Sequence, residues 1–184
     1  DANSAYAGVF ITPSNGAAFQ YRTAAGAATS NAVTAGPVAP YWVKLARVGS
    51  TFTAYTSADG ITWTTRGTPQ TITMGTSIYV GLAVTSHTTA TLGSVTFDNV
   101  GIVPTANWST ADIGSVNLVG ASFYDTPVAM VVGSGADIWG TVDAFRYTYT
   151  TASGDCDITA RVTAIDNTNV WAKAGVMIRE TTAA

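Results

Sequence analysis

The chain has 184 residues, of which 47% are hydrophobic and only 10% are charged. This length suits one domain with a sizeable core, and two compact domains would be tight. A net charge of −3, with eight scattered Lys and Arg residues, excludes the basic surface of a nucleic-acid-binding protein. No apolar run approaches the roughly 20 residues of a membrane helix, so no membrane insertion is expected. Polar surface made of Thr, Ser, Asn and Gly favours an extracellular or cell-surface protein, with any secretion signal outside this sequence.

The first hundred residues consist of short alternating segments separated by turns rich in Gly, Asn and Asp. Alternation of apolar and polar residues is typical of half-buried β-strands. The pair Asp59-Gly60 is a strong signal for a two-residue hairpin turn. The strands predicted in this half are 5–12, 17–23, 32–34, 40–48, 51–56, 61–65, 70–74, 77–85 and 92–100.

The stretch 101–111 breaks this pattern. Pro104 and the polar residues around it indicate a linker, and Trp108 is its one large side chain. Beyond the linker, strands are predicted at 118–124, 128–132, 145–150, 158–165 and 170–179. No window has a helical period, so the sequence predicts an all-β protein, a two-sheet antiparallel sandwich of roughly a dozen strands.

The predicted core follows from the inward positions of these strands. The residues expected to be buried between the sheets are Val43, Leu45, Ile78, Val80, Leu82, Val95, Phe97, Ile158, Val162, Val176 and Ile178. Cys156 alternates with Ile158 and cannot form an internal disulfide, so we interpret it as a small buried hydrophobe.

The two ends of the chain have the pattern of one hairpin. The strand that leads to Ala184 and the strand that follows Asp1, written in succession, give strand, polar turn and strand. A strand without its hairpin partner would leave an exposed edge, which proteins rarely tolerate. We therefore expect Asp1–Thr12 to pair with the last strand, within one chain as in a circular permutant or from a neighbouring copy. An engineered permutant is a third alternative.

Six longer motifs stand out in the sequence, at 40–64, 79–87, 95–100, 133–145, 154–162 and 171–180. Together they resemble a family of concanavalin A-like, laminin-G-like β-sandwich modules. The resemblance implies a jelly-roll sandwich of a type that recurs in tandem in large secreted bacterial proteins and beside glycoside hydrolases. The family order begins near Trp108 and ends at 95–100, so residues 1–100 would be the second half of the sandwich and 112–184 the first.

The residues offer little for catalysis. His87 is the only histidine, and the sequence VTSHTT favours a turn or surface position for it. Glu180 is the only glutamate, whereas glycosidases need two carboxylates around the sugar bond. A catalytic pair would have to combine it with an aspartate, such as Glu180 with Asp137. We expect no enzymatic activity and no cofactor.

Two groups of residues could still form a site. The first is Asp137, Trp139 and Asp143: we favour a structural role in which the carboxylates satisfy turn amides and Trp139 plugs the sandwich, with calcium or sugar binding as the alternative. The second is the non-core face that carries aromatic and cationic side chains. This face could bind carbohydrate, or it could pack under a loop or against another copy. Its residues are Tyr6, Arg161, Trp171, Lys173 and Arg179.

Two functions from different classes therefore stay open. The first is a non-enzymatic structural subunit or repeat of an extracellular filament or giant surface protein, whose partners are copies of itself. The alternative is a carbohydrate-binding module of a secreted glycoside hydrolase or adhesin, whose partner is a polysaccharide. In the first case Asp1, Pro104, Trp108 and Ala184 would serve assembly or linkage.

Overall fold

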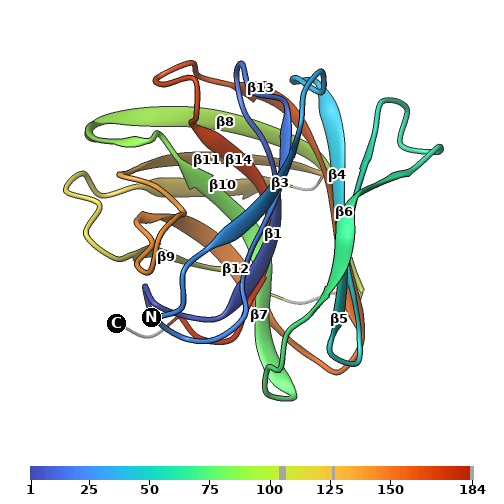
Figure 1. Ribbon diagram of the computed structural model, residues 1–184. Coiled ribbons are helices and arrows are strands. Elements are labelled where there is room, and N and C mark those ends of the chain that lie inside the picture. The colour runs from blue at the N-terminus through green and yellow to red at the C-terminus, as the bar shows by residue number, and fades with distance from the viewer. Residues whose placement is uncertain (104–106, 126, 183–184) are drawn as a thin grey trace.

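The protein is a sandwich of two antiparallel β-sheets. The computed structural model describes residues 1–103, 107–125 and 127–182. These residues form fourteen strands and no helix, and the two sheets of seven strands face each other across a shared core (Figure 1). The predicted fold class, an all-β two-sheet antiparallel jelly-roll sandwich, is confirmed.

The sheets are named A and B here. Sheet A contains, in spatial order, β3 (Ser30–Thr34), β2 (Ala17–Arg22), β1 (Tyr6–Ile11), β14 (Lys173–Arg179), β7 (Ser77–Thr85), β12 (Phe145–Ser153) and β9 (Ser109–Ile113). Sheet B contains β10 (Ala121–Asp125), β11 (Val128–Gly135), β8 (Thr88–Val103), β13 (Cys156–Ile165), β4 (Tyr41–Val48), β5 (Thr51–Ser57) and β6 (Thr64–Thr71).

The two halves of the chain interleave in both sheets. In sheet A, β14 from the second half lies between β1 and β7 from the first. In sheet B, β13 from the second half lies between β8 and β4 from the first. Neither half of the chain therefore makes a continuous sheet alone.

The inward faces of the strands form the main core. All eleven residues predicted for this core have at most 2% of their surface exposed. Cys156 is buried against the same core, as predicted. Burial of each large apolar side chain contributes about 1.5–3 kcal/mol, so a weakly charged chain can be stable without a disulfide.

A second apolar layer covers the outer face of sheet A. Both faces of β1 and β14 are buried along their whole length. Tyr6, Phe10 and Met177 project away from the main core, where Ile138 from the loop 136–144 covers them. Ile138 is fully buried, whereas the neighbouring Trp139 is 41% exposed. The loop is thus anchored by Ile138 and not, as predicted, by Trp139.

Several element boundaries differ from the prediction. The linker is shorter than 101–111, because β8 continues through Val103 and β9 begins at Ser109. The segments 61–65 and 70–74 are not two strands: one irregular strand, β6, runs from Thr64 to Thr71. Trp108 is half-buried and packs against Tyr124 with 5.2 Å between ring centroids. Pro104 and Ala184 lie outside the described residues.

The turn at Asp59-Gly60 is also larger than predicted. It is a loop between the end of β5 at Ser57 and the start of β6 at Thr64, and not a two-residue hairpin turn. The Asp59 carboxylate accepts hydrogen bonds from the backbone nitrogens of Thr62 and Ile61, at 2.7 and 2.8 Å. These bonds order the loop and hold the pKa of Asp59 well below its usual range.

Candidate functional site

A pocket of about 210 Å³ opens on the outer face of sheet A, beside the loop 136–144. Strand alternation places Gln20 on this face, because its neighbours Phe19 and Tyr21 pack toward the main core. Asn31 is the cross-strand partner of Gln20, so the two amides share the face. The lining residues are Gln20, Asn31, His87, Trp139, Trp171 and Lys173.

Gln20 is the feature of the pocket that the fold itself does not explain. Only 2% of its surface is exposed, and its side-chain oxygen Oε1 has no hydrogen-bond partner among the described residues. A buried polar atom left without a partner costs about 1–3 kcal/mol. An acceptor in this position is suited to a hydroxyl donor that enters the pocket.

Two indole rings at the pocket remain accessible. Trp139 is 41% exposed and Trp171 is 36% exposed, although large aromatic side chains usually bury most of their surface. The backbone nitrogen of Trp171 donates a hydrogen bond to the Asn169 side-chain oxygen at 2.8 Å. An exposed indole offers an apolar surface on which a ligand can stack.

A carboxylate balances the charge at the pocket wall. Asp137 accepts a hydrogen bond from the Lys173 ammonium, and its other oxygen lies 3.1 Å from Nε2 of His87. Burial lowers the pKa of Lys173, and the Asp137 carboxylate opposes that shift. Asp137 also accepts a hydrogen bond from the backbone nitrogen of the next residue, Ile138, at 2.7 Å, which helps to orient its carboxylate.

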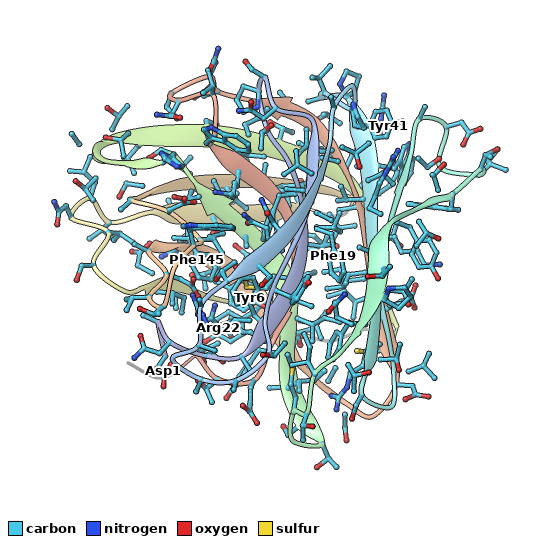
Figure 2. All side chains as sticks on the ribbon, in the orientation of Figure 1. Asp1, Tyr6, Phe19, Arg22, Tyr41 and Phe145 are labelled. Atoms are coloured by element: carbon cyan, nitrogen blue, oxygen red, sulfur yellow. The ribbon has the colours of Figure 1, made fainter. Side chains whose placement is uncertain are left out.

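A buried charged cluster lies under the same loop, away from the pocket lining. Asp143 pairs with Arg22 at 2.7 Å and with Arg179 at 3.3 Å, and all three side chains are fully buried. Figure 2 shows Tyr6, Arg22 and Phe145 gathered in this region. The Arg22 guanidinium lies 5.1 Å from the Tyr6 ring centre, and the Arg179 guanidinium lies 5.2 Å from that of Phe145. Burial raises the pKa of Asp143, and the two arginines oppose that shift.

The structure separates the site residues predicted from the sequence into three groups. Tyr6 and Arg179 are fully buried and do not line the pocket, so the alternative of packing under a loop describes them. Trp139, Trp171 and Lys173 do come together in the pocket. Arg161 lies in sheet B, where it pairs with Asp98 at 3.3 Å, and so it cannot share the face of the others.

The same cluster holds the start of the chain against its end. Arg179 donates to the backbone oxygen of Asp1, and Arg22 donates to those of Ala2 and Ser4 at 3.2 and 3.1 Å. The nitrogen of Asp1 lies 2.7 Å from Oγ1 of Thr181. The strands β1 and β14 pair in full antiparallel register within one chain, which is the first of the two pairings predicted.

Sequence reasoning missed three lining residues. The alternation of Gln20 with Phe19 and Tyr21 is a signal that it faces outward, but not that it lines a pocket. Asn31 and His87 carry no such signal, because their place beside Gln20 depends on the tertiary fold. His87 does occupy the expected turn, between β7 and β8, and is partly exposed.

No protein-family model and no curated protein matches this chain. Within residues 1–103, 107–125 and 127–182, no three His, Cys, Asp or Glu side chains are grouped as a metal site would require. The same residues contain no helix that could cross a membrane.

Proposed function

We propose that the protein is a non-enzymatic carbohydrate-binding module and that the pocket at Gln20 is its binding site. The observation that supports the proposal is the buried Oε1 of Gln20, which has no hydrogen-bond partner among the described residues and belongs to a pocket that two accessible indoles also line. A sugar presents hydroxyl donors at its edge and apolar C–H groups on its face. The first would satisfy Gln20, and the second would stack on Trp139 or Trp171.

The size and charge of the pocket restrict the class of saccharide that can bind. Sites for drug-sized ligands occupy about 300–1,000 Å³, so a pocket of about 210 Å³ suits a single sugar ring. Because Asp137 balances Lys173, the pocket wall offers no uncompensated charge to an acidic sugar. We therefore propose a neutral saccharide. The resemblance to concanavalin A-like modules found beside glycoside hydrolases supports a role in a secreted enzyme or adhesin.

The test is a binding measurement on matched variants. We expect Gln20→Leu, Trp139→Ala and Trp171→Ala each to weaken binding by roughly two- to tenfold, since loss of one hydrogen bond or one stacking ring is worth about 0.5–1.5 kcal/mol. Calorimetry with a panel of neutral oligosaccharides and retention on insoluble polysaccharides are the readouts. Gln70→Leu and Phe123→Ala, both on sheet B, are the controls. Absence of binding across the panel, or equal binding by all variants, would overturn the proposal.

A second candidate function is a structural subunit or tandem repeat that associates with copies of itself on the outside of a bacterial cell. The resemblance to modules that recur in tandem in large secreted bacterial proteins supports this candidate. Denaturing electrophoresis of native material separates the alternatives. A band near 18.9 kDa indicates a separate subunit, and a very large chain indicates a repeat.

A further inference from the structure

Lys173 is a buried amine in direct contact with a carboxylate. It begins β14 on the outer face of sheet A, and only 2% of its surface is exposed. Its ammonium donates to Oδ1 of Asp137, in the loop 136–144 that covers this face. Oδ1 is bonded to Cγ, the atom that an amine attacks when it forms an amide. The fold therefore places a nucleophile beside the carbon with which it can react.

Hydrogen bonds of the loop hold Asp137 in this position. Its backbone oxygen accepts a hydrogen bond from the nitrogen of Ala144 at 2.7 Å, which closes the base of the loop. The next residue, Ile138, is fully buried, and its backbone nitrogen donates to Oδ1 of Asp137 at 2.7 Å. Two groups that a fold keeps in contact react as if at very high concentration, with effective molarities of about 10⁵–10⁸ M for well-oriented pairs.

A third group lies at the other oxygen of the carboxylate. Nε2 of His87 is 3.1 Å from Oδ2 of Asp137, within hydrogen-bonding distance. The sheet places His87 there, because Thr85, two residues earlier, is the register partner of Lys173. The φ of His87 is 59°, a left-handed conformation that is uncommon in residues other than glycine and gathers at reactive sites. The imidazole is thus positioned to stabilise charge on Oδ2.

We propose that the side chains of Lys173 and Asp137 condense to an amide, an isopeptide bond that ties the loop 136–144 to β14. The carboxylate provides the carbon, the amine is the nucleophile, and His87 is the donor to the oxygen on which charge develops. Burial lowers the pKa of Lys173, which favours the neutral amine, the nucleophilic form.

The reaction balances without any other reactant. The ammonium of Lys173 passes one proton to Oδ1 of Asp137, which gives a neutral amine beside a carboxylic acid. The nitrogen lone pair forms the Nζ–Cγ bond, and the carbonyl electron pair moves to Oδ2, where Nε2–H of His87 stabilises it. Nζ passes a second proton to Oδ1. The Cγ–Oδ1 bond then breaks, the pair on Oδ2 forms the carbonyl again, and Oδ1 leaves with both protons as water.

The bond would close a covalent ring across the sandwich. Asp137 and Lys173 are 36 positions apart, and the chain between them contains β12 of sheet A and β13 of sheet B. Closure of such a ring restricts the unfolded chain and keeps the loop that carries Trp139 attached to β14. An amide, like the ion pair, leaves the pocket wall without net charge, so the inference does not depend on saccharide binding.

The first test is the intact mass of the full chain, measured by mass spectrometry in denaturant. We expect a mass lower than that of the sequence by one water. Asp137→Asn should reach the same final mass, because its amide releases ammonia in place of water and leaves the same bond. Lys173→Met should have the mass of its own sequence. An unmodified parent would overturn the proposal. So would a water loss that persists in Lys173→Met, because an aspartate can also lose water to its own backbone.

Tryptic digestion locates the bond without any variant. Trypsin does not cleave after a lysine whose amine has become an amide. The fragment 67–146, which contains Asp137, should therefore stay joined to the fragment 162–179, uncut at Lys173. Separate fragments, with cleavage after Lys173, would contradict the proposal even if the variants failed to fold.

The other lysine of the chain is the matched control. Nζ of Lys44 lies 3.8 Å from the carboxylate of Asp157, and both side chains are partly exposed. This pair has neither the burial of Lys173 nor the loop that holds Asp137. We expect trypsin to cleave after Lys44, and a cross-link there as well would show that burial and position do not select the reacting pair.

The rate of water loss tests the role of His87. Glycine accepts the left-handed backbone at this position, so His87→Gly removes the imidazole with little strain. Protein made in a cell-free system is sampled over time and quenched in denaturant. We expect the variant to lose its water about a hundredfold more slowly than the parent, the usual effect of removing one donor to a developing oxyanion. Equal rates would overturn the role of His87.

Discussion

Arg22 and Asp143, separated by 121 positions in the sequence, form a two-point ion pair in the interior of the protein. Nη2 of Arg22 lies 2.7 Å from Oδ1 of Asp143, and Nη1 lies 2.9 Å from Oδ2. Because the same carboxylate also contacts Arg179, one acidic side chain supports two buried cations. These contacts join β2, β14 and the loop 136–144, on which Trp139 reaches the pocket.

Asp143→Asn should therefore destabilise the fold. The substitution leaves two buried guanidinium groups without a counter-charge, at a cost of about 3–5 kcal/mol. Urea unfolding followed by circular dichroism measures the loss. Asp125→Asn, at an exposed position, is the control and should change the free energy of unfolding by less than about 0.5 kcal/mol. Equal midpoints for the two variants would show that the buried cluster contributes little.

Ile138→Ala should mainly reduce stability, whereas Trp139→Ala should mainly reduce saccharide binding. Ile138 is fully buried in the second apolar layer, so its truncation should cost about 2–5 kcal/mol. Trp139 is partly exposed, so its truncation should cost about 1 kcal/mol or less while it removes a wall of the pocket. Thermal unfolding checks the first property, and saccharide titration checks the second. A larger stability loss in Trp139→Ala would restore the tryptophan as the plug.

Gly60→Ala should destabilise the protein more than Gly26→Ala. Both glycines have positive φ, 76° and 73°, so alanine costs about 1–2 kcal/mol at either position. At Gly60 an added Cβ would also lie 2.7 Å from the Trp42 ring, whereas at Gly26 it would meet nothing within 4 Å. Overpacking of this kind adds about 1–3 kcal/mol. Urea unfolding of the pair isolates the steric cost, and equal losses would mean that the Trp42 ring moves aside freely.

Cys156 should resist alkylation in the folded protein. Burial raises the pKa of its thiol to about 11, so the reactive thiolate is scarce near neutral pH. The rate of reaction with iodoacetamide should rise with an inflection near pH 11 when folded, and near the ordinary value of about 8.5 in denaturant.

The same shift links the thiol to stability. A pKa raised in the folded state gives a contribution that is complete below about pH 8.5 and is lost as pH rises through about 11. Cys156→Ala should therefore lose less stability than the parent protein between these pH values. Fast alkylation of the folded protein at neutral pH would contradict the buried, protonated thiol.

The sequence correctly predicted which strand residues face the core between the two sheets. Alternation with period two assigned the inward residues of β4, β7, β13 and β14 correctly, because the residues of one strand face share one environment. It could not tell that the opposite face of β1 and β14 is covered too. Tyr6 and Arg179 alternate with core residues along their strands, and solvent-facing side chains would show the same alternation. Their burial depends on Ile138 and Asp143, which approach from a loop distant in sequence.

The pairing of the two terminal strands was predicted only in part. Alternation in 5–11 and 170–178 predicted that the two terminal strands belong to one hairpin, and their register of pairing agrees. The partner that fixes this hairpin, the cluster of Arg22, Asp143 and Arg179, was not predicted. An ion pair between distant residues leaves no periodic trace in a sequence.

The sequence by itself therefore determined the all-β class, the sandwich, the inward faces and the pairing of the ends, since each follows from local alternation and turn residues. Only the tertiary structure decided which outward side chains reach solvent and which residues line the pocket. Gln20, His87 and Trp139 come from β2, a turn and a loop, and they meet because the loop 136–144 folds over sheet A. A loop's position is set by the few buried contacts at its anchor, here Ile138 and Asp143, and those contacts exist only once the sheets are assembled.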